Sequence, residues 1–117
     1  MKLSDINPYL EYESVSSAYK NASQFFRKTP TIKSKFLSES TGTDVYLKLE
    51  NTQVTGAFKI RGALNALIHL DPKKNSETVV CASSGSHAMG MCQAGRFLNK
   101  GVIVFLPEIT PQYKIEK

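Results

Sequence analysis

Two short runs of β-branched and apolar residues, separated by one helix, constrain this chain most. Residues 78–82 (T-V-V-C-A) and 102–106 (V-I-V-F-L) each predict a buried strand with apolar side chains on both faces. Between them, residues 86–98 are apolar almost all round, which predicts a helix covered by neighbours on both sides. Because a strand, a helix and a second strand in this order are typical of a right-handed parallel crossover, this part of the chain predicts an α/β fold.

The same alternation begins earlier in the chain. Residues 44–50 predict a strand, and residues 58–70 predict the clearest helix, which Asp71-Pro72 should end. One apolar stripe runs along that helix: Ile60, Ala63, Leu64, Leu67 and Ile68. A last helix is expected to begin at Thr110-Pro111, with Thr110 as N-cap and Pro111 as first helical residue. Strands and helices thus alternate from residue 44 onward, and we expect a parallel sheet with flanking helices.

The two ends of the chain complete this picture. Residues 12–28 predict an amphipathic helix that Thr29-Pro30 ends, and residues 31–33 predict a short strand followed by a polar segment. The helix expected at Pro111 has room for only about two turns before the sequence ends, too few to cover a sheet. We therefore expect residues 1–117 to be the front, N-terminal portion of a larger catalytic domain.

Composition excludes several classes of protein. The chain has 117 residues, the size of one ordinary domain. Its apolar runs are far too short to span a membrane, and no apolar leader follows Met1, so the cytoplasm is the expected location. The two cysteines, Cys81 and Cys92, cannot form a disulfide framework and are interpreted as small core residues. With His69 and His87 they match no zinc spacing, so no metal site is expected.

The net charge of +5 raises the question of a nucleic-acid partner. The densest basic segment contains Arg27, Lys28, Lys33 and Lys35, with Phe25, Phe26 and Phe36 nearby. Such a segment can form a basic face with interleaved aromatic rings, but a solvated helix end followed by a turn is the favoured interpretation. We expect no nucleic-acid partner. A basic chain also suits ligands that carry a phosphate or a carboxylate.

The segment T-G-A-F-K-I-R-G-A at residues 55–63 places Lys59 in the first turn of the predicted helix. The helix dipole disfavours a cation there, and Arg61 follows two residues later, so we expect a lowered pKa for Lys59. An amine of that kind can form a Schiff base at neutral pH, and Phe58 could pack against a flat ring. The alternative, a solvated surface lysine, is common and stays open on these residues alone.

The segment S-S-G-S-H-A-M-G at residues 83–90 lies where a predicted strand meets a predicted helix. Hydroxyl groups and free backbone N–H groups converge there, which predicts a site for a carboxylate or a phosphate. A plain N-cap by Ser83, Ser84 or Ser86 is the alternative. The segment matches neither the dinucleotide fingerprint nor the P-loop nor the nucleophile elbow.

Together these segments resemble the front of a fold type II (tryptophan synthase β-like) pyridoxal-phosphate enzyme, closest to the threonine/serine dehydratase and serine racemase branch. The resemblance extends over five segments in register: R-K-T-P-T at 27–31, V-Y-L-K-L-E-N-T-Q at 45–53, residues 54–63, residues 83–90, and residues 103–114. It implies pyridoxal phosphate as cofactor and a small hydroxy amino acid, threonine or serine, as substrate. It also implies a homo-oligomeric parent enzyme.

The resemblance assigns a role to each matched residue. Lys59 corresponds to the lysine that forms the Schiff base and takes the α-proton, and Phe58 to the ring beside the cofactor. The substrate-carboxylate loop corresponds to Ser83, Ser84, Gly85 and His87. In racemases the position of Ser84 holds a serine that acts as acid and base on the opposite face. Ser86 corresponds to an asparagine that hydrogen-bonds the cofactor ring oxygen.

Two departures and one omission accompany the resemblance. Ala57 replaces a usual serine, and Ser86 replaces the usual asparagine and cannot donate an amide hydrogen. The family's downstream glycine-rich phosphate loop has no counterpart in this sequence. The predicted function is a threonine/serine ammonia-lyase that is inactive as the isolated chain. The alternatives are a serine racemase and a non-catalytic remnant or interaction protein.

Overall fold

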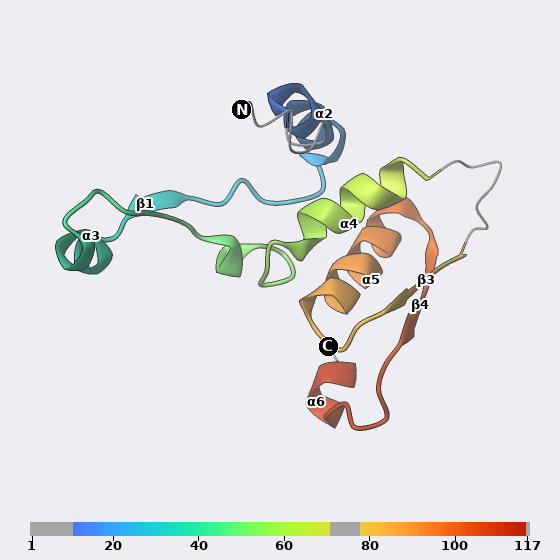
Figure 1. Cartoon of the computed structure of the whole chain (residues 1–117). Helices are drawn as coiled ribbons and strands as arrows, with labels where there is room; N and C mark the ends of the chain where they lie inside the picture. The colour runs from blue at the N-terminus through green and yellow to red at the C-terminus, as the bar shows by residue number, and fades with distance from the viewer. Residues whose placement is uncertain (1–10, 71–77, 117) are drawn as a thin grey trace.

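The elements expected from the sequence are largely present in the computed structural model, which describes residues 11–70 and 78–116 (Figure 1). In chain order they are α2 (Tyr12–Ala22), β1 (Thr31–Lys33), α3 (Lys35–Thr41), β2 (Tyr46–Lys48), the 3-10 helix η2 (Glu50–Thr52), α4 (Lys59–Ile68), β3 (Thr78–Ala82), α5 (Ser86–Leu98), β4 (Gly101–Phe105) and α6 (Gln112–Ile115). The predicted helix stop at Asp71-Pro72 lies outside the described residues.

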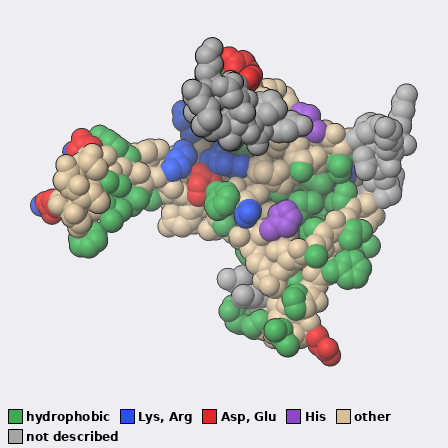
Figure 2. Space-filling view, viewed as in Figure 1, with side chains coloured by type: hydrophobic (Ala, Val, Ile, Leu, Met, Phe, Trp, Pro, Cys, Tyr) green, Lys and Arg blue, Asp and Glu red, His purple; other side chains and the backbone are tan. Residues whose placement is uncertain are grey.

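The parallel crossover expected from residues 78–106 is confirmed. β3 pairs with β4 in parallel, in a register that runs from Thr78 opposite Gly101 to Ala82 opposite Phe105, and α5 connects the two strands. Only one face of this pair is covered, which corrects the expectation of strands buried on both faces. Val80, Ile103 and Phe105, at 61%, 50% and 63% exposure, point away from the helices. Hydrophobic side chains accordingly gather on the surface around β3 and β4 (Figure 2).

The expected strand at residues 44–50 does not join that parallel sheet. It is limited to β2, which pairs antiparallel with β1, with Ile32 opposite Leu47. The reversal occurs in α3, where the sequence suggested only a polar segment: the Ser34 hydroxyl caps the helix at the Leu37 N–H, and Gly42 ends it with a left-handed φ of 67°. A connection this short can join only antiparallel neighbours, so β2 pairs with β1 and not in parallel with β3.

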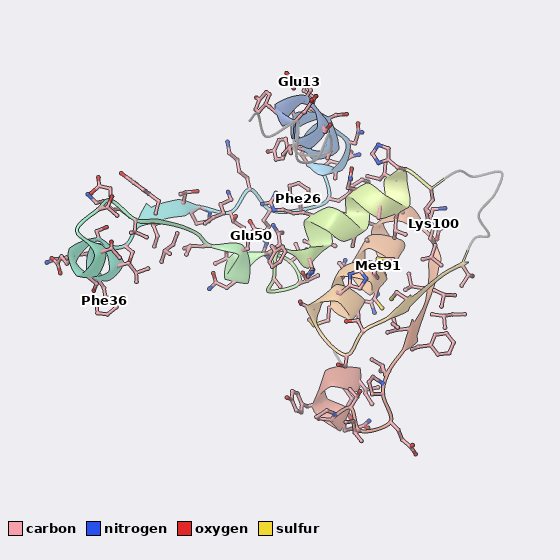
Figure 3. All side chains as sticks on the ribbon, viewed as in Figure 1. Glu13, Phe26, Phe36, Glu50, Met91 and Lys100 are labelled. Atoms are coloured by element: carbon pink, nitrogen blue, oxygen red, sulfur yellow. The ribbon has the colours of Figure 1, made fainter. Side chains whose placement is uncertain are left out.

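The two strands and α3 form an arm that extends away from α4 and α5 (Figure 1). Phe36 on α3 lies at the end of the arm farthest from Phe26 (Figure 3). The arm explains why the radius of gyration, 17.1 Å, exceeds the value of about 13 Å expected for a compact chain of this length. The helices that pack against the parallel strands thus lie in the second half of the chain.

The first helix ends earlier than the predicted boundary at residue 28. α2 stops at Ala22, and a tight turn follows in which the Phe25 N–H donates to the Ala22 carbonyl at 3.0 Å. The turn lets Phe25 stack on Phe97 of α5, with ring centroids 5.7 Å apart. A continued helix could not bring this ring to α5, so packing of the aromatic side chain overrides the helical periodicity.

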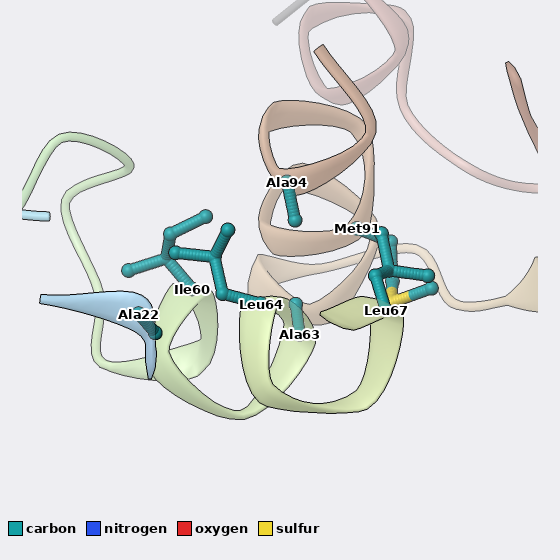
Figure 4. Packing of buried hydrophobic residues seen from close by; sticks show 7 residues of the cluster. All are labelled: Ala22, Ile60, Ala63, Leu64, Leu67, Met91 and Ala94. Carbon is teal, nitrogen blue, oxygen red and sulfur yellow. The ribbon is translucent and has the colours of Figure 1, made fainter. Parts of the chain in front are cut away.

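The buried core lies between α2, α4 and α5 (Figure 4). α4 contributes the predicted stripe, of which Ile68 is only partly buried. The buried hydrophobic residues of the core are Ala22, Ile60, Ala63, Leu64, Leu67, Met91 and Ala94. Gly95 brings α5 close to β4, because a Cβ at this position would lie 2.5 Å from Val102 Cγ2. This close approach fixes α5, and with it the loop that precedes it, against the sheet.

The last helix begins one residue later than expected. Pro111 has an extended ψ of 138° and is the N-cap residue of α6, so it does not occupy the first helical position. None of the helices within residues 11–70 and 78–116 is long and apolar enough to cross a membrane.

Candidate active site

The loop at residues 83–86 joins the end of β3 to the start of α5. The Ser83 N–H donates to the Phe105 carbonyl at 3.1 Å, and the Ser83 hydroxyl accepts from the Gly85 N–H at 3.2 Å. Gly85 is the N-cap residue of α5, and within the described residues no side chain caps this helix. The alternative of a plain serine N-cap is therefore wrong. The N–H groups of the first turn are left without a capping oxygen, the arrangement in which helix N-termini bind anions.

This loop forms one wall of a cavity of about 490 Å³, a size typical of small-molecule sites. The rest of the wall comes from the turn before α4, one face of α5 as far as its last turn, the end of β4, and α6. The lining residues are Val54, Thr55, Ser84, Gly85, Ser86, Ala88, Met89, Cys92, Gln93, Arg96, Val104, Leu106, Tyr113 and Ile115. Three of the predicted site residues thus share one cavity, while Ser83 lies half-buried just behind it.

Lys59 and Phe58 lie at the start of α4, outside that cavity lining. Lys59 is the first helical residue, as predicted, and Phe58 is the N-cap residue. Both side chains are exposed, and Lys59 Nζ lies 5.3 Å from the centre of the Phe58 ring. The predicted neighbour His87 is also exposed and does not line the cavity. The structure therefore presents an accessible amine beside an accessible aromatic ring.

Gly90 connects the two halves of the candidate site. A Cβ at Gly90 would lie 3.2 Å from both the Lys59 carbonyl carbon and the Ile60 nitrogen. Gly90 comes four residues after Ser86, which is about one helical turn. The backbone of Lys59 is therefore packed against α5 one turn from the uncapped helix start.

We expect Gly90→Ala to destabilise the chain by about 1 kcal/mol, because the added methyl group must push α4 and α5 apart. Alanine has a higher helix propensity than glycine, and this gain partly offsets the steric cost at Gly90. Gly62→Ala, which has the same gain in propensity without the close contact, is therefore the matched control. No described atom lies within 4 Å of the Cβ position of Gly62, and that change should stabilise by about 0.5–1 kcal/mol. Urea unfolding followed by circular dichroism measures both, and stabilisation by Gly90→Ala would contradict the close packing.

Arg61 forms an ion pair that the sequence analysis missed. Its Nε and NH2 groups donate to the two carboxylate oxygens of Glu50 at 2.8 and 2.7 Å. Residues two apart on a helix point to opposite sides, so Arg61 turns away from Lys59. The expectation that Arg61 acts as a second free positive charge beside Lys59 is therefore corrected. The hydrogen bond from Arg61 lowers the pKa of Glu50 to about 2, and the same bond raises the pKa of Arg61.

The Glu50 carboxylate should make stability depend on acid. Its pKa in the folded chain, about 2, lies below its ordinary 4.5, so the stabilisation is complete above pH 4.5 and disappears as the pH falls toward 2. The expected loss is on the order of 2 kcal/mol, since the pair retains some contact with solvent. Unfolding curves across this pH range, with Glu50→Gln as control, measure it. An identical acid dependence in the variant would contradict the assignment.

The basic segment does not form one continuous face. The Arg27 guanidinium donates to the Thr52 carbonyl at 3.2 Å, while Lys33 pairs with Asp44 at 2.7 Å in the arm. Phe26 and Phe36 lie far apart (Figure 3), so the aromatic rings do not interleave with these charges. The absence of a nucleic-acid partner stays a prediction.

Cys81 and His69 occupy structural positions, whereas Cys92 faces the cavity. Cys81 packs beside the core, and burial raises the pKa of its thiol. Cys92 lines the cavity, which corrects its interpretation as a core residue. His69 Nδ1 lies 2.7 Å from the Asn65 carbonyl at the end of α4. In the described part of the chain, no three His, Cys, Asp or Glu side chains gather in a way that could hold a metal ion.

Two groups of site residues were missed in the sequence. Arg96 lines the cavity together with Met89 and Cys92. Their spacing of three and four residues places all three on one helical face, a signal that the almost uniformly apolar composition of the helix obscured. The other group is Glu50 with its partners, where no local spacing reveals a pair that is 11 residues apart across a turn.

Comparison with known proteins identifies relatives of this arrangement. Residues 22–117 match the family described as "Pyridoxal-phosphate dependent enzyme". The chain is 41% identical over 101 residues to the catabolic L-threonine dehydratase of Staphylococcus aureus, covering 86% of this chain and 29% of that protein. It is 38% identical over 105 residues to the L-threonine ammonia-lyase of Thermotoga maritima, covering 90% of this chain and 26% of that protein.

Solved structures agree with the sequence matches. Maize serine racemase superposes with a TM-score of 0.82 at 31% identity, over 91% of this chain and 32% of that one. The chain thus spans about three tenths of the length of the relatives it matches.

Proposed function

The chain belongs to the family of pyridoxal-phosphate dependent enzymes, and we propose that it provides part of the catalytic domain of a threonine/serine ammonia-lyase. The observation that carries the proposal is the packing of Gly90 against the Lys59 backbone. This contact holds the Lys59 backbone about one helical turn from the uncapped α5 N-terminus. The named relatives among threonine dehydratases and ammonia-lyases support the reaction class.

The residues present fit pyridoxal phosphate in their chemistry. Lys59 offers an accessible primary amine for an aldehyde, and Phe58 offers an exposed ring for a flat heterocycle. The uncapped N–H groups at the start of α5 suit an anionic group. When bound, this cofactor supplies an electron sink that makes the α-proton of an amino acid acidic.

We assign a proposed role to each residue of the candidate site. Lys59 Nζ would hold the cofactor and is also the amine that would accept the α-proton of the substrate. Ser83, Ser84, Gly85 and His87 would bind the substrate carboxylate through hydroxyl and backbone N–H groups. Ser86 lines the cavity and would be the residue for the cofactor ring oxygen, with a shorter reach than an asparagine. Ala57 offers no hydroxyl beside Phe58.

A serine racemase is the second candidate, and Ser84 favours it. The Ser84 side chain is half-buried and lines the cavity, so a hydroxyl group can face a bound amino acid there. A racemase needs such a group to exchange a proton on the face opposite Lys59. The similarity to maize serine racemase supports this alternative.

Absorbance spectroscopy tests the proposal. Pyridoxal phosphate is added and the unbound cofactor is then removed; the chain should retain a band near the visible edge, and L-threonine or L-serine should then change that band. Lys59→Ala should weaken the retained band strongly, because only the less reactive exposed lysines remain. A spectrum that is the same with and without Lys59 would overturn the proposed function. Turnover is measured in a protein that also contains the downstream part of the family's catalytic domain; there, conversion of L-serine to D-serine with no release of ammonia would select the racemase.

A further inference from the structure

A polar network centred on Glu50 includes Arg61, which lies two residues after Lys59. The Glu50 carboxylate accepts both hydrogen bonds of Arg61 and a further one from the Thr29 hydroxyl. The side chains of Arg61 and Glu50 are only 29% and 15% exposed. Paired charges with this geometry and burial are held more rigidly than surface ion pairs. The network therefore ties α4 to η2 and to the segment before β1.

Gln53 fixes the backbone next to Phe26, and Phe26 contacts Arg61 of the pair. The Gln53 side chain accepts from the Arg27 N–H at 2.8 Å and donates to the Arg27 carbonyl at 2.9 Å, and the residue is only 4% exposed. The Arg61 guanidinium also lies over the Phe26 ring, 4.3 Å from its centre. Figure 3 shows Phe26 and Glu50 on the side of α4 that faces the arm. Arg61 is thus held by a carboxylate and by an aromatic ring.

The start of α4 needs such support. Phe58, its N-cap residue, has helical dihedral angles and makes no side-chain capping bond. An uncapped first turn frays readily, and Lys59 is the first residue of that turn. Gly90 of α5 supports the Lys59 backbone directly, while Arg61 anchors the same turn to Glu50.

We propose that Glu50 and Arg61 form a positioning pair that holds the first turn of α4, and with it Lys59, in the orientation needed to bind the cofactor. The pair touches neither cofactor nor substrate and acts through the backbone of α4. This proposal rests on the proposed role of Lys59. It adds that the reactivity of Lys59 depends on a carboxylate nine residues earlier in the sequence.

The test compares Glu50→Gln with Asp44→Asn. Both changes remove one carboxylate from an ion pair, and the pair of Asp44 with Lys33 lies exposed in the arm. Hydrogen exchange is measured at the Ala63 amide, which bonds the Lys59 carbonyl in a regular helix, and at amides in the middle of α5. The second readout is the ratio of pyridoxyl labelling at Lys59 to labelling at Lys35 after reduction with borohydride.

In Glu50→Gln we expect exchange at Ala63 to accelerate and the labelling ratio to fall, each by about tenfold, with α5 unchanged. Asp44→Asn should change neither readout. If Glu50→Gln prevents folding, Arg61→Lys, which keeps the charge but loses the two-pronged bond, replaces it. Equal acceleration in α4 and α5, or an unchanged labelling ratio in a folded variant, would overturn the positioning role. If the unmodified chain shows no preference for Lys59, the proposed function fails, and the exchange data still decide whether the pair holds the turn.

Discussion

Reduction of the chain with borohydride in the presence of pyridoxal phosphate should leave a pyridoxyl group on Lys59 in about tenfold excess over other exposed lysines. All of these amines can react with an aldehyde in solution, so the excess must come from the surroundings of Lys59. Phe58 lies beside the amine, with its ring centre 5.3 Å from Nζ. The packing of Gly90 against the Lys59 backbone also holds this residue in one place beside α5. Peptide mapping by mass spectrometry measures the distribution.

The matched control for this experiment is Lys35. Its side chain is 89% exposed at the start of α3, and its amine lies 3.8 Å from the Glu39 carboxylate. Lys35→Ala should leave the labelling of Lys59 unchanged, whereas Lys59→Ala should reduce total labelling sharply. An even distribution over all exposed lysines would show that Lys59 has no special environment.

The sequence predicted best those elements whose boundaries depend on local chemistry. β3 and α5 begin and end at the predicted residues, because β-branched runs and serine-glycine turns mark their limits. α2 ends early because Phe25 packs on Phe97, a contact between residues that no local pattern connects. The pairing of β2 with β1 was likewise hidden, since strand order alone suggests a parallel neighbour. Long-range packing thus accounts for the two main errors.

The candidate site shows the same division. The sequence alone was enough to propose Lys59 and the Ser83–His87 segment as site residues, because each lies in a segment that resembles a known motif. The partners of those residues could not: Gly90 contacts Lys59 across a helix interface, and Glu50 reaches Arg61 across a turn. A sequence motif specifies reactive groups, whereas the contacts that orient them depend on the fold.

Leu64→Ala should cost about 3 kcal/mol and move the urea midpoint of unfolding to a much lower concentration. Leu64 is fully buried at the centre of the core between α2, α4 and α5. Ordinary domains have only about 5–15 kcal/mol of stability, and among the described residues one face of the parallel sheet is left uncovered. The small core must therefore supply a large share of the total, so that one large cavity removes much of the stability.

Urea unfolding followed by circular dichroism measures this loss, and Leu47→Ala is the matched control. Leu47 on β2 is 37% exposed and lies in the arm, away from the core. Its truncation should cost less than about 1 kcal/mol, because the surrounding solvent already contacts the side chain. Equal losses in the two variants would show that the arm and the core contribute alike to folding. A larger loss at Leu64 would place the folding free energy in the α2–α4–α5 interface, the same interface that holds Lys59 against α5.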